Sequence, residues 1–182
     1  MNKILKILSF FFLATVYGCG SGPVLVDAER YGPLDLGAYQ TFDFFDIDAE
    51  NPGTPEFDQN IAYLKEAISQ KMAGYGLRQT SANPDLKINL GIVVEDKVQT
   101  RETNLATDPF LYIGQRSYTW KVEEIPVGTY KEGTLTMHLV DNASEEPVWV
   151  GTIHRALPKK AKNTPGTIDD VVELLFQKMS KK

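Results

Sequence analysis

Apolar residues recur at helical spacing over residues 55–74. The repeat consists of Phe57, Ile61, Leu64, Ile68 and Met72, which fall on one face of a helix with 3.6 residues per turn. Thr54 is a candidate N-cap, Pro55 suits the first helical position, and the Gly-Tyr-Gly sequence at 74–76 ends the pattern. We therefore expect an amphipathic helix here, with its apolar face packed on a core.

A second helix is predicted near the C-terminus. Thr167 and Asp170 have the spacing of a capping box that would open this helix. The residues Ile168, Val171, Leu175 and Met179 then share one face.

Between these helices the pattern changes to alternation. Every second residue over 86–94 is apolar, which predicts a half-buried strand. Residues 134–140 alternate again and residues 148–157 read as their hairpin partner, with Leu139 opposite Trp149. Residues 39–48 are rich in aromatics and predict the first strand. Residues 97–109 lack periodicity and predict a loop, and residues 110–124 predict one or two further strands.

The order of strand, helix, several strands and helix predicts an α+β fold. Two amphipathic helices bury their apolar faces best on one face of a sheet. The predicted architecture has two layers, with an antiparallel sheet of about four to six strands and both helices packed on the same face.

The first 18 residues have the layout of a secretory signal. Lys3 and Lys6 precede an uncharged apolar run at residues 7–16, which is shorter than the roughly 20 residues of a membrane span. Val16-Tyr17-Gly18 then stands directly before Cys19, the only cysteine. This order resembles the lipobox of bacterial lipoproteins, although Tyr17 is larger than the residue usual at its position. The resemblance implies cleavage before Cys19, a diacylglyceryl group on its sulfur and an acylated, for example palmitoylated, amino group. The alternative is an ordinary cleaved signal.

The remaining chain has the size of one domain. We predict a signal peptide at residues 1–18, a lipidated cysteine and tether at 19–31, and a single domain at 32–182. The formal net charge of the chain is −5, and the leader carries lysines but no acid. An acidic protein with scattered lysines argues against nucleic acid and against docking on anionic headgroups. The residue after Cys19 is Gly20 and not the aspartate that often retains lipoproteins in the inner membrane. We therefore expect the protein to be anchored in the outer membrane and to face the periplasm.

Residues 130–157 carry a resemblance to a known family. The segment contains Tyr130, Glu132, Gly133, Thr134 and Leu135, then Leu139, Val140 and Asp141, then Val148, Trp149 and Gly151. Two shorter matches are Tyr39, Thr41 and Phe42, and Pro84, Asp85 and Leu86. These residues resemble motifs of the bacterial lipoprotein family called domain of unknown function 4136. One departure is His138, since the family tends to carry an acid at this position of the strand. The resemblance implies an envelope lipoprotein with an α+β fold and implies no activity. Aromatics beside strand glycines predict close packing, so Trp149 is expected in the core.

Candidate chemistry in the sequence is sparse. With only His138 and His154, a three-histidine zinc site is impossible, and the predicted hairpin separates the two by about 13 Å. Asp43, Asp46, Asp48 and Glu50 form an acidic cluster without the spacing of a calcium loop. We predict no metal, no cofactor and no catalytic residue.

The most suggestive segment for binding is residues 109–120. Phe110, Tyr112, Arg116, Tyr118 and Trp120 combine aromatics with one arginine, a composition enriched at binding hot spots. The other interpretation is an aromatic strand that packs under the helices.

Three functions of different classes remain open. The first is a non-enzymatic lipoprotein that binds an envelope protein, glycan or lipid beside the bilayer in which Cys19 anchors it. The second is a hydrolase that acts on cell-envelope material. The third is a structural subunit of an assembly.

Overall fold

The computed structural model describes residues 24–26, 33–49, 53–104, 107–108 and 122–180. Two helices, two short 3-10 turns and a six-stranded sheet lie within these residues. The helices are α2 (Pro55–Gly74) and α3 (Thr164–Ser180), and the turns are η3 (Leu36–Ala38) and η4 (Ala161–Asn163). The strands are β1 (Val24–Val26), β2 (Thr41–Ala49), β3 (Arg78–Gln79), β4 (Leu86–Glu102), β5 (Glu124–Asp141) and β6 (Pro147–Ala156).

The sheet is mixed, in the strand order β1-β6-β5-β4-β2-β3. The pairs from β1 through β4 are antiparallel, as predicted, but β2 is parallel to both β4 and β3. The prediction of a wholly antiparallel sheet was therefore wrong at this edge. The reason is the position of α2 between β2 and the next strands, because a helical crossover returns the chain to the sheet in the same direction.

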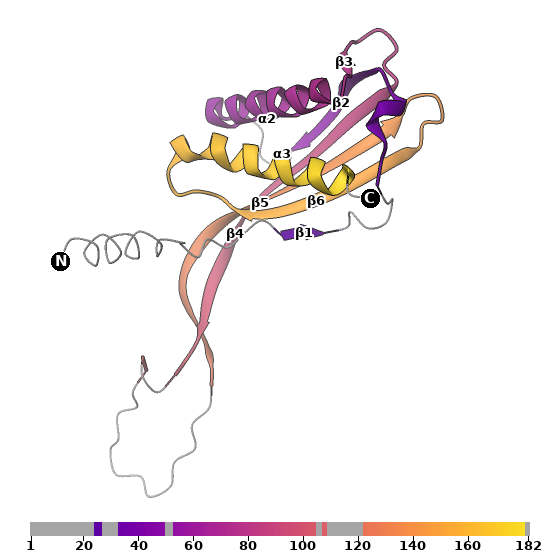
Figure 1. Cartoon of the computed structure of the whole chain (residues 1–182). Coiled ribbons are helices and arrows are strands. Elements are labelled where there is room, and N and C mark those ends of the chain that lie inside the picture. The colour runs from indigo at the N-terminus through magenta and orange to yellow at the C-terminus, as the bar shows by residue number, and fades with distance from the viewer. Residues whose placement is uncertain (1–23, 27–32, 50–52, 105–106, 109–121, 181–182) are drawn as a thin grey trace, which may run out of the picture.

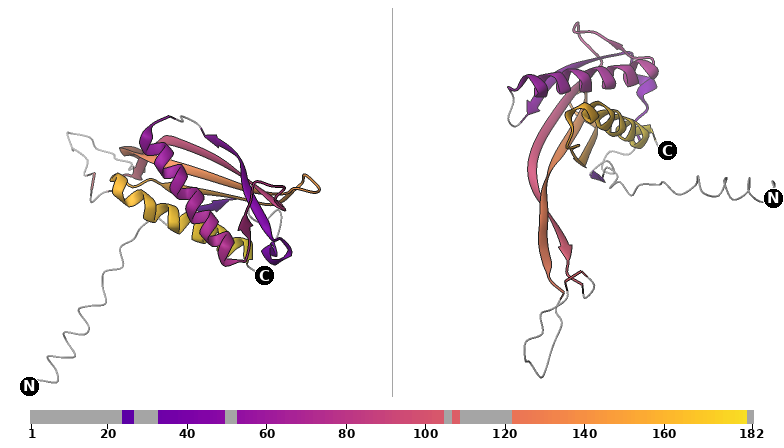
Figure 2. Two further views of the ribbon diagram at one scale, coloured as in Figure 1. Left: turned by 90° about the horizontal axis from the view of Figure 1, so that it is seen from above. Right: turned by 90° about the vertical axis from the view of Figure 1, so that its left-hand side faces the viewer.

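Both helices cover the same face of the sheet, which confirms the predicted two-layer α+β fold (Figure 1 and Figure 2). Alternate residues of β4, namely Leu86, Ile88 and Leu90, are buried beneath the helices. The helices contribute their predicted stripes to this core: Leu64, Ile68 and Met72 from α2, and Val171, Leu175 and Met179 from α3.

Trp149 lies at the centre of the core, as the sequence predicts. It is fully buried and pairs across the hairpin with Leu139, the predicted partner. The ring lies over Gly151, where an added Cβ would overlap Cη2 of Trp149 and would lie 3.0 Å from Cδ2 of Leu175 in α3. The missing side chain at Gly151 therefore leaves the space in which Trp149 packs between β6 and α3.

Several boundaries differ from the prediction. β4 continues to Glu102 and β5 begins at Glu124, so residues 97–102 are strand where the sequence predicts a loop. The backbones of these residues pair with β5, but neither face of the ribbon is buried on a core. Apolar and polar residues therefore do not alternate along this part of the strand. Val24–Val26, which the sequence assigns to the tether, pairs with β6 as an edge strand.

The predicted capping box of the C-terminal helix was wrong. α3 begins at Thr164, directly after η4. Thr167 therefore lies inside the helix, where its hydroxyl donates to the carbonyl oxygen of Asn163 at 3.3 Å. The N-cap at Thr54 is confirmed, because its hydroxyl accepts from the amide of Phe57 at 3.2 Å.

The packing of Trp149 on Gly151 makes a testable prediction. Trp149→Ala is expected to lower the free energy of unfolding by about 3–5 kcal/mol, as for large aromatic truncations in cores. Gly151→Ala is expected to cost about 1–3 kcal/mol, because the added methyl overlaps the ring. Urea denaturation followed by circular dichroism measures both.

Two controls make this test specific. In a Trp149→Ala background, Gly151→Ala should cost much less, because the ring is gone. Gly91→Ala, where the new Cβ lies an ordinary 3.7 Å from Cβ of Thr136, should change stability little. An equal cost of Gly151→Ala in both backgrounds would contradict the proposed packing.

Candidate functional site

The residues that the sequence nominates for lipidation and binding lie outside the described residues. They are Cys19, Phe110, Tyr112, Arg116, Tyr118 and Trp120. Their roles therefore stay predictions. The described residues that flank the aromatic segment are Asp108 and Val122, which belong to the far end of a long hairpin.

This hairpin projects from the body as a two-stranded arm (Figure 1 and Figure 2). We define the arm as residues 95–102 of β4 and 124–131 of β5. Glu132 opposite Ala156 is the last described pair between β5 and β6, and the amide of Leu157 still donates to the carbonyl oxygen of Lys131 at 2.7 Å. Beyond Lys131, β5 pairs with β4 alone in the described residues. Eight strand residues span about 25 Å. Val98 is 61% exposed and Val127 is 48% exposed, so the arm presents apolar as well as charged side chains.

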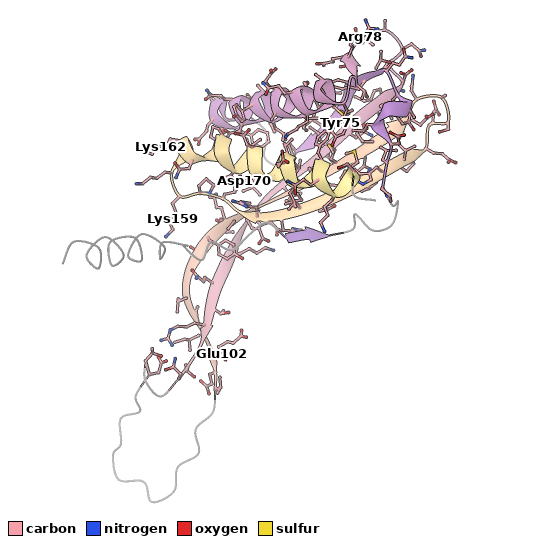
Figure 3. All side chains as sticks on the ribbon, viewed as in Figure 1. Tyr75, Arg78, Glu102, Lys159, Lys162 and Asp170 are labelled. Atoms are coloured by element: carbon pink, nitrogen blue, oxygen red, sulfur yellow. The ribbon has the colours of Figure 1, made fainter. Side chains whose placement is uncertain are left out.

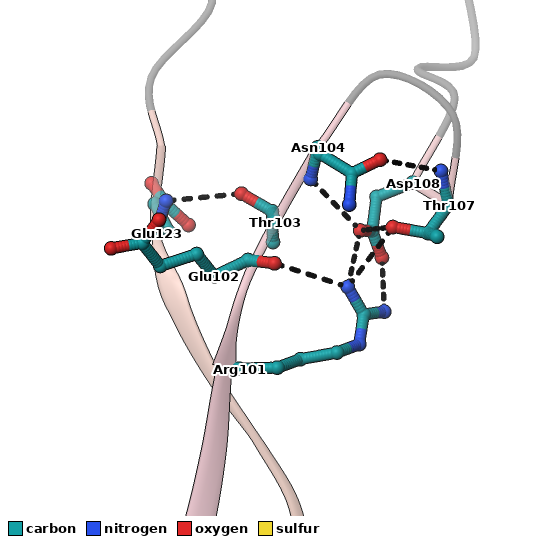
Figure 4. Close-up of polar contacts among 7 residues, drawn as sticks. All are labelled: Arg101, Glu102, Thr103, Asn104, Thr107, Asp108 and Glu123. Atoms are coloured by element: carbon teal, nitrogen blue, oxygen red, sulfur yellow. Dashed lines mark hydrogen bonds and ion pairs between the residues drawn. The ribbon is translucent and has the colours of Figure 1, made fainter. Parts of the chain in front are cut away.

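The end of the arm is closed by a polar network (Figure 4). The guanidinium of Arg101 donates two hydrogen bonds of 2.6 Å, one to each carboxylate oxygen of Asp108. The hydroxyl of Thr107 and the amide of Asn104 also donate to Asp108, at 2.7 and 3.2 Å. The amide of Thr103 donates to the carbonyl oxygen of Glu123 at 2.8 Å, which joins the two strands here.

An apolar pocket lies at the base of the arm, where the helices begin. Its volume is about 150 Å³. The first turns of both helices and the last body residues of β4, β5 and β6 line it, and its apolar walls include Phe57, Ile61, Ile92, Val94, Ile153, Leu157 and Ile168. The helical spacing of Phe57, Ile61 and Ile168 predicts that these residues belong to the core. Ile61 and Ile168 are instead partly exposed. The helical pattern does not reveal this exposure, because it depends on the place at which the helices and the sheet separate.

Contacts between the helices hold the outer side of the pocket. The hydroxyl of Tyr63 donates to both carboxylate oxygens of Asp169 at 3.1 Å, and this hydrogen bond raises the pKa of Tyr63. Tyr63 and Asp169 adjoin Leu64 and Ile168 in the chain, two residues that line the pocket. Further along, Lys71 forms an ion pair with Glu173.

Cationic residues lie in and directly beside the lining of the pocket in the chain. Arg155 lines it and donates to Asp170 at 3.0 Å. Leu157 and Thr164 also line it, and the loop that joins them carries three exposed lysines, Lys159, Lys160 and Lys162. Figure 3 labels Lys159 and Lys162. Within the described part of the chain, no ion pair involves these lysines. The run is plain in the sequence, although the lysines of the chain as a whole look scattered.

The family-resemblance residues at the other end of the body hold turns together. The carboxylate of Asp85 accepts from the amides of Gln40 and Thr41 at 2.8 and 3.0 Å, and the Gln40 bond is the main cause of its lowered pKa. Asp141 accepts from the amides of Ala143 and Ser144 at 2.9 and 2.8 Å. Asp85 and Asp141 thus have a structural role in the loops that they cap.

The histidines and acids do not form a metal site in the described residues. His138 pairs with Val150 and His154 with Thr134, so four residues separate them along the hairpin, as predicted. Nδ1 of His154 lies 2.8 Å from the hydroxyl of Thr134. Asp43 of the acidic cluster accepts from the side-chain amide of Gln79 at 2.9 Å. No group of three potential ligands occurs in that part of the chain.

None of the helices in the described ranges is both long and apolar enough to cross a membrane. The described residues form an α+β domain of two layers with a projecting arm and an apolar pocket at its base.

The chain belongs to the family described as domain of unknown function (DUF4136), whose model matches residues 27–179. This result confirms the resemblance found in the sequence. No curated protein matches the sequence significantly.

Similar solved structures are distant in sequence. A PDZ domain protein from Parabacteroides distasonis is 13% identical with a TM-score of 0.47, and the match covers 88% of this chain and 35% of that protein. The PelC dodecamer from Paraburkholderia phytofirmans is 13% identical with a TM-score of 0.44, covering 87% of this chain and 98% of that one. A minor lipoprotein from Acinetobacter baumannii is 12% identical with a TM-score of 0.31, covering 78% and 93%.

The closure of the arm is expected to depend on pH. The two hydrogen bonds from Arg101 hold the pKa of Asp108 well below its ordinary value. Because the pKa is lowered in the folded state, the stabilisation is present above the unfolded value of about 3.9 and is lost as the pH falls through the folded value. We expect the amide of Asn104 to stay protected from hydrogen exchange at pH 4 and to lose protection only well below it.

Asp108→Asn provides the comparison for this prediction. It should reduce protection of the Asn104 amide at pH 4 and above, because a neutral amide bonds Arg101 less strongly than a carboxylate does. The amide of Ile153 in the body serves as the control for global unfolding. Equal protection of Asn104 in the wild type and in Asp108→Asn would contradict the role of this network.

Proposed function

We propose that this protein is a lipid-anchored, non-enzymatic binding or assembly module of the bacterial cell envelope. Its anchor is an acylated Cys19 in the outer membrane, facing the periplasm, and its arm contacts a partner protein. The observation that carries this proposal is the arm itself, a ribbon that leaves the body with two strand edges unpaired in the described residues.

The arm has the properties of a protein-binding element. An isolated two-stranded ribbon is at best marginally stable in water, and unpaired strand edges offer rows of N–H and C=O groups to another chain. The exposed Val98 and Val127 add apolar surface, while the Arg101–Asp108 network fixes the end of the ribbon. The aromatic segment with Arg116 joins Asp108 to Val122 in the chain, so we propose that the arm presents it to the partner.

An anchored position suits such a module. A lipid tether confines the protein to one surface, where a high effective concentration makes weak binding sufficient. β1 begins at Val24, so four residues separate it from Cys19, and the five Cα–Cα steps between them span at most about 17 Å. The partner is therefore expected close to the same membrane.

The anchor is tested by Cys19→Ser. This variant is expected to leave the membrane fraction or to accumulate as unprocessed precursor, because the thiol that accepts the diacylglyceryl group is missing. Membrane fractionation and intact-mass analysis measure the two outcomes. An unmodified Cys19 on the mature wild-type chain would disprove the lipidation.

The arm is tested by photo-crosslinking in intact cells. A photoreactive residue at Val98 is expected to give discrete protein adducts, because this exposed side chain lies on the arm. The control site is Glu66, an exposed residue of α2, which should give few. Arg116→Ala combined with Tyr118→Ala should then reduce the adducts from Val98 and leave the melting temperature nearly unchanged.

Three results would contradict this part of the proposal. Equal adducts from Val98 and Glu66 would remove the arm as the specific contact. Loss of folding in the Arg116→Ala, Tyr118→Ala variant would assign that segment to the core. Turnover of cell-wall or lipid fragments by the purified protein would favour a hydrolase.

A further inference from the structure

We propose that the apolar pocket takes up the end of one acyl chain of an anionic phospholipid, and that the lysine loop contacts its phosphate. The lysine loop is defined as the segment with Lys159, Lys160 and Lys162. This site is separate from the arm and adds a lipid contact to the proposed protein contact.

The size and lining of the pocket suit an acyl chain. Its volume is about 150 Å³ and its walls are mostly apolar side chains from two helices and three strands. An enclosed apolar cavity of about 150 Å³ holds a benzene-sized group of about six carbons. The pocket therefore has room for the terminal segment of a single chain, whereas a second chain or a folded peptide would not fit.

The charges at the mouth favour an anion on one side. The lysine loop supplies three cations beside the pocket lining, and none of them belongs to an ion pair among the described residues. Arg155 lines the pocket with its charge balanced by Asp170, and Asp169 accepts from the hydroxyl of Tyr63. Glu56 and Asp58 are exposed in the first turn of α2, so the α2 side of the mouth is acidic. A phosphate is therefore expected beside the loop that leads into α3.

The position of the N-terminal strand brings a bilayer close to this mouth. Val24 pairs with His154, which lies between Ile153 and Arg155, two residues that line the pocket. Cys19 precedes Val24 by five residues, a span of at most about 17 Å. This step rests on the proposed lipidation of Cys19. If Cys19 is acylated, the pocket, the lysine loop and the anchor all lie near the same lipid surface.

The site is tested with the mature chain from residue 19 carrying Cys19→Ser, which retains every described element. The probe is dihexanoyl phosphatidylglycerol below its micelle concentration, titrated by calorimetry. Saturable binding of one lipid per chain is expected. Ile61→Trp, which fills the pocket from α2, should weaken binding about tenfold or more, whereas Ala62→Trp, on the exposed side of the same helix, should not.

The headgroup contact has its own comparison. Dihexanoyl phosphatidylcholine should bind more weakly than phosphatidylglycerol, and Lys160→Glu with Lys162→Glu should abolish this preference. Arg78→Glu with Lys178→Glu makes the same change in charge at exposed positions outside the pocket lining and should preserve it. Equal affinity for the two lipids in the wild type would overturn the anionic contact.

Three further outcomes overturn the pocket assignment. The first is that phosphatidylglycerol shows no saturable binding, and the second is that Ile61→Trp binds it as tightly as the unsubstituted pocket does. The third is that the Cys19→Ser chain binds the lipid but the acylated wild type does not. The last would mean that the protein's own acyl chain fills the pocket. If Ile61→Trp does not fold, Ile168→Phe fills the pocket from α3 and decides the same question. Because the Cys19→Ser chain carries no anchor, its lipid binding is measured independently of the proposed lipidation and of the arm.

Discussion

The mismatch in length between helices and strands sets the shape of this molecule. β4 and β5 contain 17 and 18 residues, so each is about 60 Å long at about 3.4 Å per residue. α2 and α3 contain 20 and 17 residues and extend only about 25–30 Å at about 1.5 Å per residue. The helices therefore cover about half of the central strands. The covered half holds the core, and the uncovered half becomes the arm.

The pocket arises at the boundary between these halves. Val94 is the last body residue of β4 before the arm and pairs with Gly133 of β5, and both line the pocket. The sheet bends away from the helices here (Figure 2), so the two layers separate at the helix N-termini. A side chain at Gly133 would come within 3.0 Å of Leu157, which shows that Leu157 packs in the space that this glycine leaves.

The two ends of the body differ in chemistry. At one end, Asp85 and Asp141 accept backbone hydrogen bonds and hold the loops in fixed conformations. At the other end lie the pocket, the lysine loop, the base of the arm and the edge strand β1. The residues that carry the family resemblance at the first end, together with Trp149 and Gly151, maintain the fold. Candidate binding surfaces are thus concentrated at the second end, where polar groups and apolar walls are left partly exposed.

The sequence by itself determined the elements that carry a periodic apolar face. The stripes of both helices, the alternation of β4 and the pairing of Leu139 with Trp149 could be predicted because burial requires them. The sequence did not predict the parallel edge at β2, the strands of the arm or edge strand β1, because backbone pairing leaves little trace in the pattern of side chains. It also did not predict the start of α3. The aromatic candidates Phe110–Trp120 remain predictions. The pocket and its cationic mouth were decided only by tertiary structure, because residues distant in the chain meet where the two layers separate.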